Sequence, residues 1–207
     1  MNNNSLIIKV CGMRDSQNIR AVEALGVDWM GFIFHPLSKR YVGEQLAYLP
    51  EETKRVGVFV NDKFETILEA IELYNLNSVQ LHGNESPEFC KQLREQGIQV
   101  IKAFGITDYL PLEKIAEYEG CCNYYIFDTQ TTQYGGSGIK YDWNILQSYR
   151  GNTPFLLSGG IGPSDVDAIK SFSHPMCVGI DINSKFELSP ANKNIESIHQ
   201  FIKSLKQ

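Results

Sequence analysis

The chain has 207 residues, of which 43% are hydrophobic and 21% charged, with a formal net charge of −5 and a pI near 5.4. This length suits one sizeable domain with its own core, and the acidic balance argues against nucleic acid as the main partner. No run approaches the ~18 apolar residues that cross a bilayer, and the polar start Met1–Ser5 is unlike a secretory signal. The odd count of five cysteines indicates reduced thiols, so we expect a cytoplasmic protein with no membrane partner.

Eight short apolar runs recur along the chain at intervals of about 25 residues, the spacing of a β-strand followed by a helix. They lie near residues 6–11, 28–34, 55–60, 78–82, 98–104, 123–128, 154–158 and 176–182. This alternation predicts an α/β fold, a parallel (β/α)8 or TIM barrel. A doubly wound open sheet with fewer strands is the alternative. No linker rich in Pro, Gly or Ser divides the chain, so residues 1–207 are expected to form a single domain.

Most of the segments between these runs carry an amphipathic helical pattern. Asp15 is expected to cap the first helix and Asp62 the next clear one, whereas Ser86–Pro87 combines a capping serine with proline at the first helical position. Two later helices are expected to begin at Gly162–Asp165 and to span Ile195–Leu205. The segments after the second, fifth and sixth strands have weaker patterns and predict short or irregular helices.

The first apolar run ends at Cys11 and Gly12, which puts a thiol at the carboxyl end of the first strand. Barrel enzymes carry their reactive groups at this end, although most free cysteines are small core residues. Lys9 lies two residues back on the same strand face, about 6.6 Å away by the strand rise. We therefore expect Lys9 to help ionise the thiol only weakly and to belong to a polar layer lower in the barrel.

Three further strand ends or rim loops carry candidate groups. Asp128 follows the apolar run 124–127, where desolvation would raise its pKa toward neutrality and suit a general acid; a helix cap or a salt bridge is the alternative. Arg40, in the loop after the second strand, could bind a carboxylate through its planar guanidinium or be an ordinary surface arginine. His82 could donate a hydrogen bond to a substrate or be a structural histidine.

The loops after the seventh and eighth strands contain Gly159–Gly160 and Asn183–Ser184. In barrels these two loops frequently hold a phosphate through backbone N–H groups and a helix N-terminus. Ordinary turns are the alternative. No HExxH, GxGxxG, Walker or Ser-His-Asp pattern is present, so neither a metal nor a nucleotide cofactor is expected.

A set of segments, mostly at strand ends, carries a family resemblance through its order and positions. The segments are Lys9–Gly12, Gly31–Phe34, Ser38–Val42, Val56–Asn61, Val79–Ser86, Ile101–Phe104, Phe127–Thr129, Gly135–Gly138, Leu156–Ile161 and Gly179–Asp181. Together they resemble phosphoribosylanthranilate isomerase of tryptophan biosynthesis along nearly the whole chain. The resemblance implies a TIM barrel and a cofactor-free Amadori rearrangement. The substrate it implies is N-(5-phosphoribosyl)anthranilate and the product 1-(2-carboxyphenylamino)-1-deoxyribulose 5-phosphate.

The resemblance also assigns roles to individual residues. Cys11 corresponds to the family's general base, Asp128 to its general acid, and Arg40 to the arginine that faces the anthranilate carboxylate. The phosphate loops correspond to Gly159 and Gly160 and to the segment with Asp181, Asn183 and Ser184, and His82 is expected to contact substrate. The expected partner is thus a small phosphorylated molecule, bound by a monomer or a homodimer.

Two features qualify the resemblance. The family commonly reads Val-Ser-Ser-Gly-Val-Glu after the eighth strand, whereas this chain reads Ile182–Glu187 without the glycine, with Lys185 expected to point to solvent. The loop Gly135–Gly138 is expected to be a flexible cover over the site.

Two alternative functions stay open. One is an inactive phosphosugar-binding barrel. The other is a related isomerase, such as that of histidine biosynthesis, which uses two aspartates, whereas the first strand here has Cys11.

Overall fold

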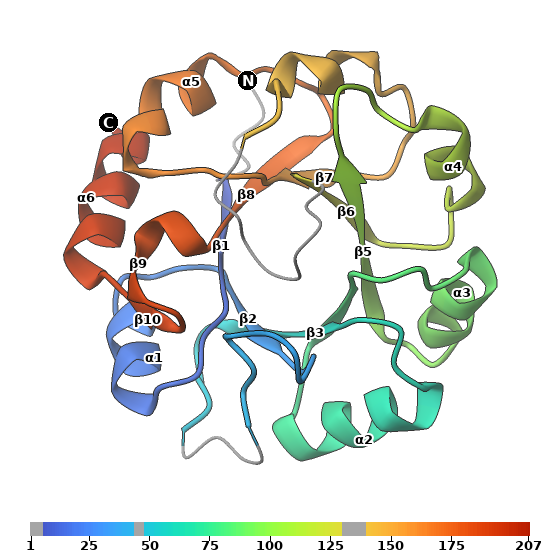
Figure 1. Ribbon diagram of the computed structural model, residues 1–207, viewed down its shortest axis with the longest axis horizontal. Helices are drawn as coiled ribbons and strands as arrows, with labels where there is room; N and C mark the ends of the chain where they lie inside the picture. Colours follow the sequence, from blue (N-terminus) through green and yellow to red (C-terminus); the bar gives the residue numbers. More distant parts are fainter. Residues whose placement is uncertain (1–5, 44–47, 130–139) are drawn as a thin grey trace.

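A closed barrel of eight parallel strands forms the centre of the protein (Figure 1). The computed structural model describes residues 6–43, 48–129 and 140–207. The strands are β1 (Ile7–Cys11), β2 (Trp29–Ile33), β3 (Lys54–Phe59), β4 (Ser78–Leu81), β5 (Gln99–Ile106), β6 (Tyr124–Thr129), β7 (Phe155–Leu157) and β8 (Cys177–Ile182). The strand β1 pairs with both β2 and β8, which closes the sheet. The predicted barrel is therefore confirmed, and the open sheet is wrong.

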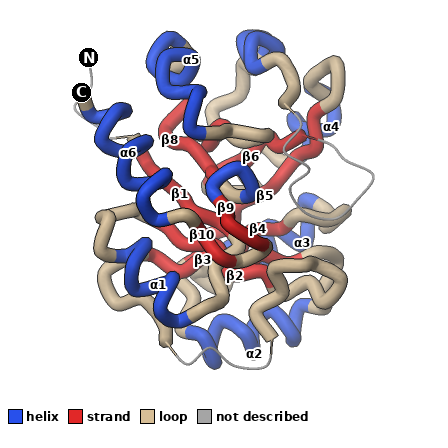
Figure 2. The backbone as a smooth tube through the Cα atoms, turned by 60° about the vertical axis from the view of Figure 1, so that its left-hand side comes forward, coloured by secondary structure: helices blue, strands red, loops and turns tan. Residues whose placement is uncertain are grey.

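Helices surround the barrel on its outer side (Figures 1 and 2). The α-helices are α1 (Ser16–Glu23), α2 (Phe64–Tyr74), α3 (Pro87–Glu95), α4 (Leu112–Glu117), α5 (Val166–Ser171) and α6 (Ile195–Lys206), and the 3₁₀ turns are η1 (Trp143–Ser148), η2 (Pro163–Asp165) and η3 (Ser184–Phe186). As predicted, the described residues of the segments after β5 and β6 form short or irregular helices, α4 and the 3₁₀ turn η1. Among the described helices, none has the length and apolarity needed to cross a membrane.

Two of the three predicted caps are present. Asp15 accepts a hydrogen bond from the backbone N–H of Asn18 at 2.9 Å, and Ser86 accepts one from Phe89 at 3.2 Å. The prediction for Asp62 is wrong, because its carboxylate instead accepts from the backbone N–H of Val60 at 3.1 Å. The residue between them, Asn61, has a φ of 56°, and this left-handed turn folds Asp62 back toward the end of β3.

The inside of the barrel is filled in layers. An apolar cluster contains Trp29, Val56, Ile101, Ala103, Ile126 and Leu156. Further along the same strands, Cys11 contacts Ile33 and Val58 nearer the carboxyl ends. The buried side chains of Lys9 and Asp181, at paired positions of β1 and β8, form a polar pair inside the barrel. The amino half of the barrel is therefore an apolar plug, and the polar and reactive groups gather toward the carboxyl ends of the strands.

Candidate active site

Cys11 is the last residue of β1 and is 95% shielded, with 5% of its surface exposed. It pairs with Gly31 of β2, where a β-carbon would lie only 2.7 Å from the Cys11 Sγ. A larger residue at position 31 would therefore displace the thiol. The thiol faces the barrel interior at the carboxyl end of the strands, as the sequence predicts.

Lys9 is the charged group most closely coupled to the thiol. Burial raises the pKa of Cys11, and the charge and hydrogen bond of Lys9 oppose that rise. The Lys9 Nζ also donates to Asp181 Oδ1 at 2.8 Å, and both side chains are buried. Burial alone would lower the pKa of Lys9, but Asp181 and Cys11 together hold it above its ordinary value, so the ammonium stays charged. Lys9 therefore opposes the rise without cancelling it, since the pKa of Cys11 stays above its ordinary value.

Asp128 lies in β6 and opens onto the barrel mouth with 28% of its side chain exposed. Its Oδ1 accepts hydrogen bonds from the backbone N–H of Thr129 at 2.9 Å and from Ser158 Oγ at 3.3 Å. Burial raises the pKa of Asp128, although these hydrogen bonds and the charge of Lys9 oppose the rise. This carboxyl group therefore keeps its proton to a higher pH than an ordinary aspartate does, which suits a general acid.

His82 follows β4, and its Nε2 lies 3.7 Å from Asp128 Oδ2. Burial, reinforced by the charge of Lys102, lowers the pKa of His82 to about 4, so the ring is neutral near pH 7. The Gln80 amide nitrogen lies 3.1 Å from His82 Nδ1. Because an amide N–H₂ can only donate, Nδ1 accepts and the ring proton is on Nε2. The ring thus presents a donor to Asp128 and to the barrel mouth.

Arg40 is buried, with 6% of its surface exposed, which excludes the alternative of a solvated surface arginine. Its Nε donates to both carboxylate oxygens of Glu187, at 2.8 and 3.1 Å, and its Nη2 donates to Glu187 Oε2 at 2.6 Å. This two-pronged pairing fixes the plane of the guanidinium. None of these bonds uses Nη1.

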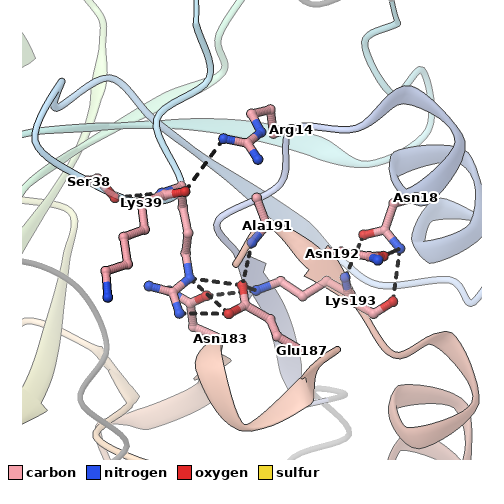
Figure 3. Close-up of polar contacts among 10 residues, drawn as sticks. Arg14, Asn18, Ser38, Lys39, Asn183, Glu187, Ala191, Asn192 and Lys193 are labelled. Atoms are coloured by element: carbon pink, nitrogen blue, oxygen red, sulfur yellow. Dashed lines mark hydrogen bonds and ion pairs between the residues drawn. The ribbon is translucent and has the colours of Figure 1, made fainter. Parts of the chain in front are cut away.

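Glu187 and Lys193 are site residues that sequence reasoning missed. They come from a hairpin of β9 (Glu187–Ser189) and β10 (Asn192–Lys193). Lys193 Nζ lies 2.7 Å from Glu187 Oε1 and 2.7 Å from Asn183 Oδ1, and Figure 3 shows these three side chains converging. Asn18 of α1 holds the hairpin in place, since it exchanges hydrogen bonds of 2.9 and 2.8 Å with the Lys193 backbone. Glu187 is the last residue of the segment Ile182–Glu187, compared above with the family pattern. No sequence pattern indicated a role for Lys193.

The two predicted phosphate loops lie after β7 and β8. Gly159 and Gly160 have φ values of 91° and 68°, a backbone path that favours glycine. Ser184 begins η3, and Lys185 is exposed as expected, with its stem beside Gly162. The loop Gly135–Gly138 lies outside the described residues. A phosphate at these loops stays a prediction.

The remaining predicted residues, Asp181 and Asn183, are already engaged within the protein. The Asp181 carboxylate is paired with Lys9 inside the barrel, and the Asn183 side-chain oxygen is bonded to Lys193. A direct contact of Asp181 with a phosphate would bring two negative charges together. In the described part of the chain, no group of three or more His, Cys, Asp or Glu side chains is arranged to hold a metal ion.

The chain resembles known proteins over nearly its whole length. A family model described as N-(5'phosphoribosyl)anthranilate (PRA) isomerase matches residues 8–204. N-(5'-phosphoribosyl)anthranilate isomerase of Phocaeicola vulgatus is 52% identical over 202 residues, which cover 98% of each protein. The chain belongs to the N-(5'-phosphoribosyl)anthranilate isomerase family.

Solved structures of this isomerase family have the same fold. The phosphoribosyl anthranilate isomerase of Thermotoga maritima matches with a TM-score of 0.83 at 35% identity, covering 98% of this chain and 99% of that chain. Another structure of the family matches with a TM-score of 0.80 at 31% identity and the same coverage. That relative is in complex with reduced 1-(o-carboxyphenylamino)-1-deoxyribulose 5-phosphate.

Proposed function

We propose that the chain catalyses the Amadori rearrangement of N-(5'-phosphoribosyl)anthranilate in tryptophan biosynthesis, with Cys11 as general base and Asp128 as general acid. The observation that carries the proposal is that Cys11 ends β1 and Asp128 lies near the end of β6 in one closed parallel barrel, so that both groups are at the same rim. The thiol and the carboxyl group therefore lie in one polar cluster at the carboxyl ends of β1 and β6. Family membership supplies the substrate class.

The acid acts first. Asp128 donates its proton to the furanose ring oxygen, the bond from C1 to that oxygen breaks, and the anthranilate nitrogen and C1 form a protonated Schiff base. The raised pKa of Asp128 keeps the proton available for this step. Near neutral pH, His82 is uncharged and its Nε2–H faces the carboxylate that remains, so it can stabilise the product of this step by hydrogen bonding.

The base acts second. The Cys11 thiolate removes the proton from C2 of the Schiff base, and the C2–H electron pair forms the C1–C2 double bond of an enolamine. The enolamine then gains a proton at C1 and loses its hydroxyl proton from O2, which gives the ketose. Lys9 favours this step because its positive charge stabilises the thiolate before the attack. Each acid or base step is typically worth about 10²–10⁴ in rate.

Recognition of the anthranilate carboxylate is assigned to Arg40. Glu187 fixes the guanidinium from one side, and the remaining Nη1 can donate to a substrate carboxylate. Replacing Arg40 by lysine keeps a cation for Glu187 but removes the planar fork. We expect KM to rise about 10- to 100-fold, the cost of losing a hydrogen bond to a charged group, with a smaller change in kcat. Steady-state kinetics measure both constants, and an unchanged KM would contradict the assignment.

The pH dependence follows from the two perturbed groups. Turnover needs Asp128 protonated and Cys11 ionised at the same time, so kcat/KM should be bell-shaped. Burial raises both pKa values. The acid limb should therefore lie above the ordinary aspartate range near ~3.9 and the alkaline limb above the ordinary cysteine value near ~8.5. A profile that stays flat through both regions would rule out this acid–base pair.

The activity itself is tested by following the anthranilate-type fluorescence of the substrate after the chain is added. An isomerase makes the signal decay with turnover, and the ketose product, which has the same mass as the substrate, can be separated by chromatography and identified by its reducing properties. The inactive phosphosugar-binding barrel would change the signal only to the extent of one bound ligand per chain. Persistence of the substrate at catalytic protein concentrations would reject the proposed function.

A further inference from the structure

The charged groups around Cys11 form two clusters of different net charge. Lys9 and Asp181 form a pair at 2.8 Å whose charges cancel. Arg40, Lys193 and Glu187 form the second cluster, in which two cations share one carboxylate. Farther across the mouth lie the neutral ring of His82 and the carboxyl group of Asp128, and Lys102 behind His82 is paired with Glu85 at 3.2 Å. The uncompensated positive charge near the thiol thus belongs to the second cluster.

Packing at Gly12 brings this cluster against the end of β1. A β-carbon at Gly12 would lie 2.6 Å from Arg40 Cδ and 2.9 Å from Asn183 Oδ1, so both side chains rest on the residue that follows Cys11. The same Asn183 oxygen accepts a hydrogen bond from Lys193 Nζ at 2.7 Å. The ammonium is therefore connected to the thiol end of β1 through a single intervening side chain.

The ammonium group of Lys193 is buried, unlike that of an ordinary surface lysine. Its side chain is fully shielded from solvent, so its field is weakened little by water. Burial lowers the pKa of Lys193, and the neighbouring Glu187 carboxylate opposes that change. Asn183 contributes an acceptor that is neutral, so it fixes the ammonium without cancelling its charge. The positive charge of Lys193 in turn favours the ionised form of Cys11.

We propose that Lys193 is a positioning residue for the isomerase reaction, a buried ammonium that stabilises the Cys11 thiolate while Asn183 and Glu187 hold it in place. The inference deepens the proposed function, because it rests on Cys11 acting as the base. It does not need Lys193 to touch the substrate.

The test measures how fast iodoacetamide alkylates Cys11 in the intact chain as a function of pH, with the Cys11 peptide quantified by mass spectrometry. Lys193→Met removes the net positive charge of the cluster and should slow alkylation at pH 7 about tenfold, with the midpoint about one pH unit higher. Glu187→Gln adds net positive charge and should speed alkylation. The double variant keeps the original net charge and should react at nearly the original rate, as should Lys193→Arg.

This order of rates separates a field effect from a structural one. If Lys193 only supported the fold, the double variant would react least like the original protein, and that result would overturn the proposal, as would an unchanged rate in folded Lys193→Met. Should circular dichroism show Lys193→Met unfolded, Asn183→Asp is the deciding variant. It keeps the size and the acceptor but cancels the charge, so it must also slow alkylation. Alkylation needs no substrate, so failure here is distinct from failure of the proposed isomerase activity.

Discussion

Replacing Cys11 by alanine is expected to lower kcat by about 10²–10⁴-fold, the usual value of a general base, while KM changes little. The thiol acts on the transition state for C2 proton removal, so its loss affects turnover more than substrate affinity. The loss of one buried sulfur atom leaves the barrel folded, because Cys11 contacts only Ile33 and Val58 within its small cluster. Stopped-flow or steady-state fluorescence of the substrate measures the effect.

The matched control is Cys177→Ala, which removes a second thiol from the barrel. Cys177 begins β8 at the opposite end of the strands, and burial raises its pKa to about 11, so it is a protonated packing residue. Its replacement should leave kcat within about twofold, since nothing in the reaction depends on it. If both variants lost activity equally, the effect at Cys11 would be structural and the base would have to be found elsewhere.

Replacing Asp128 by asparagine is expected to lower kcat by a comparable factor, about 10²–10⁴. Asparagine has the same shape and can still accept hydrogen bonds from Thr129 and Ser158 through its oxygen, but it has no proton to give to the ring oxygen. The acid limb of the pH profile should vanish together with the activity. A variant that retained near-original turnover would contradict the assignment of Asp128.

Asp142→Asn serves as the control for the second prediction. Asp142 is an exposed cap of η1 that accepts from the backbone N–H of Asn144, a role that asparagine fills equally well.

Combining Cys11→Ala with Asp128→Asn should lower kcat by less than the product of the two single losses, because the effects of groups that act in one reaction sequence are not additive. Full multiplication of the two effects would indicate that both residues act in one rate-limiting transition state and not in successive steps.

The fold was predictable because buried parallel strands give short apolar runs at a regular spacing in the sequence. That spacing also indicates which residue ends each strand, and in this way Cys11, His82 and Asp128 could be recognised as neighbours at one rim. The prediction that Asp62 caps a helix was wrong because it was inferred from the residue type alone. The left-handed turn at Asn61 depends on how the chain leaves β3, and residue type does not reveal it.

The C-terminal hairpin could not be predicted as part of the site. The bonds between Arg40 and Glu187 join residues 147 positions apart, and β9 and β10 are too short to show any periodicity. Nothing in the sequence around Lys193 distinguishes it from a surface lysine, yet it is buried where Asn18 bonds to its backbone. Sequence spacing also did not reveal that Lys9 pairs with Asp181, since it measures distances between backbone positions and ignores the reach of a long side chain.

The attachment of the hairpin to α1 has a consequence for the order in which the protein matures during translation. All eight barrel strands have been synthesised once the chain reaches Ile182, but the carboxylate that binds Arg40 and the ammonium that bonds to Asn183 come later, at positions 187 and 193. A nascent chain halted between those points would contain all eight barrel strands but would lack Glu187 and Lys193. With the roles proposed for Arg40 and Lys193, the active site is complete only after residue 193 has been synthesised and its backbone has bonded to Asn18 of α1.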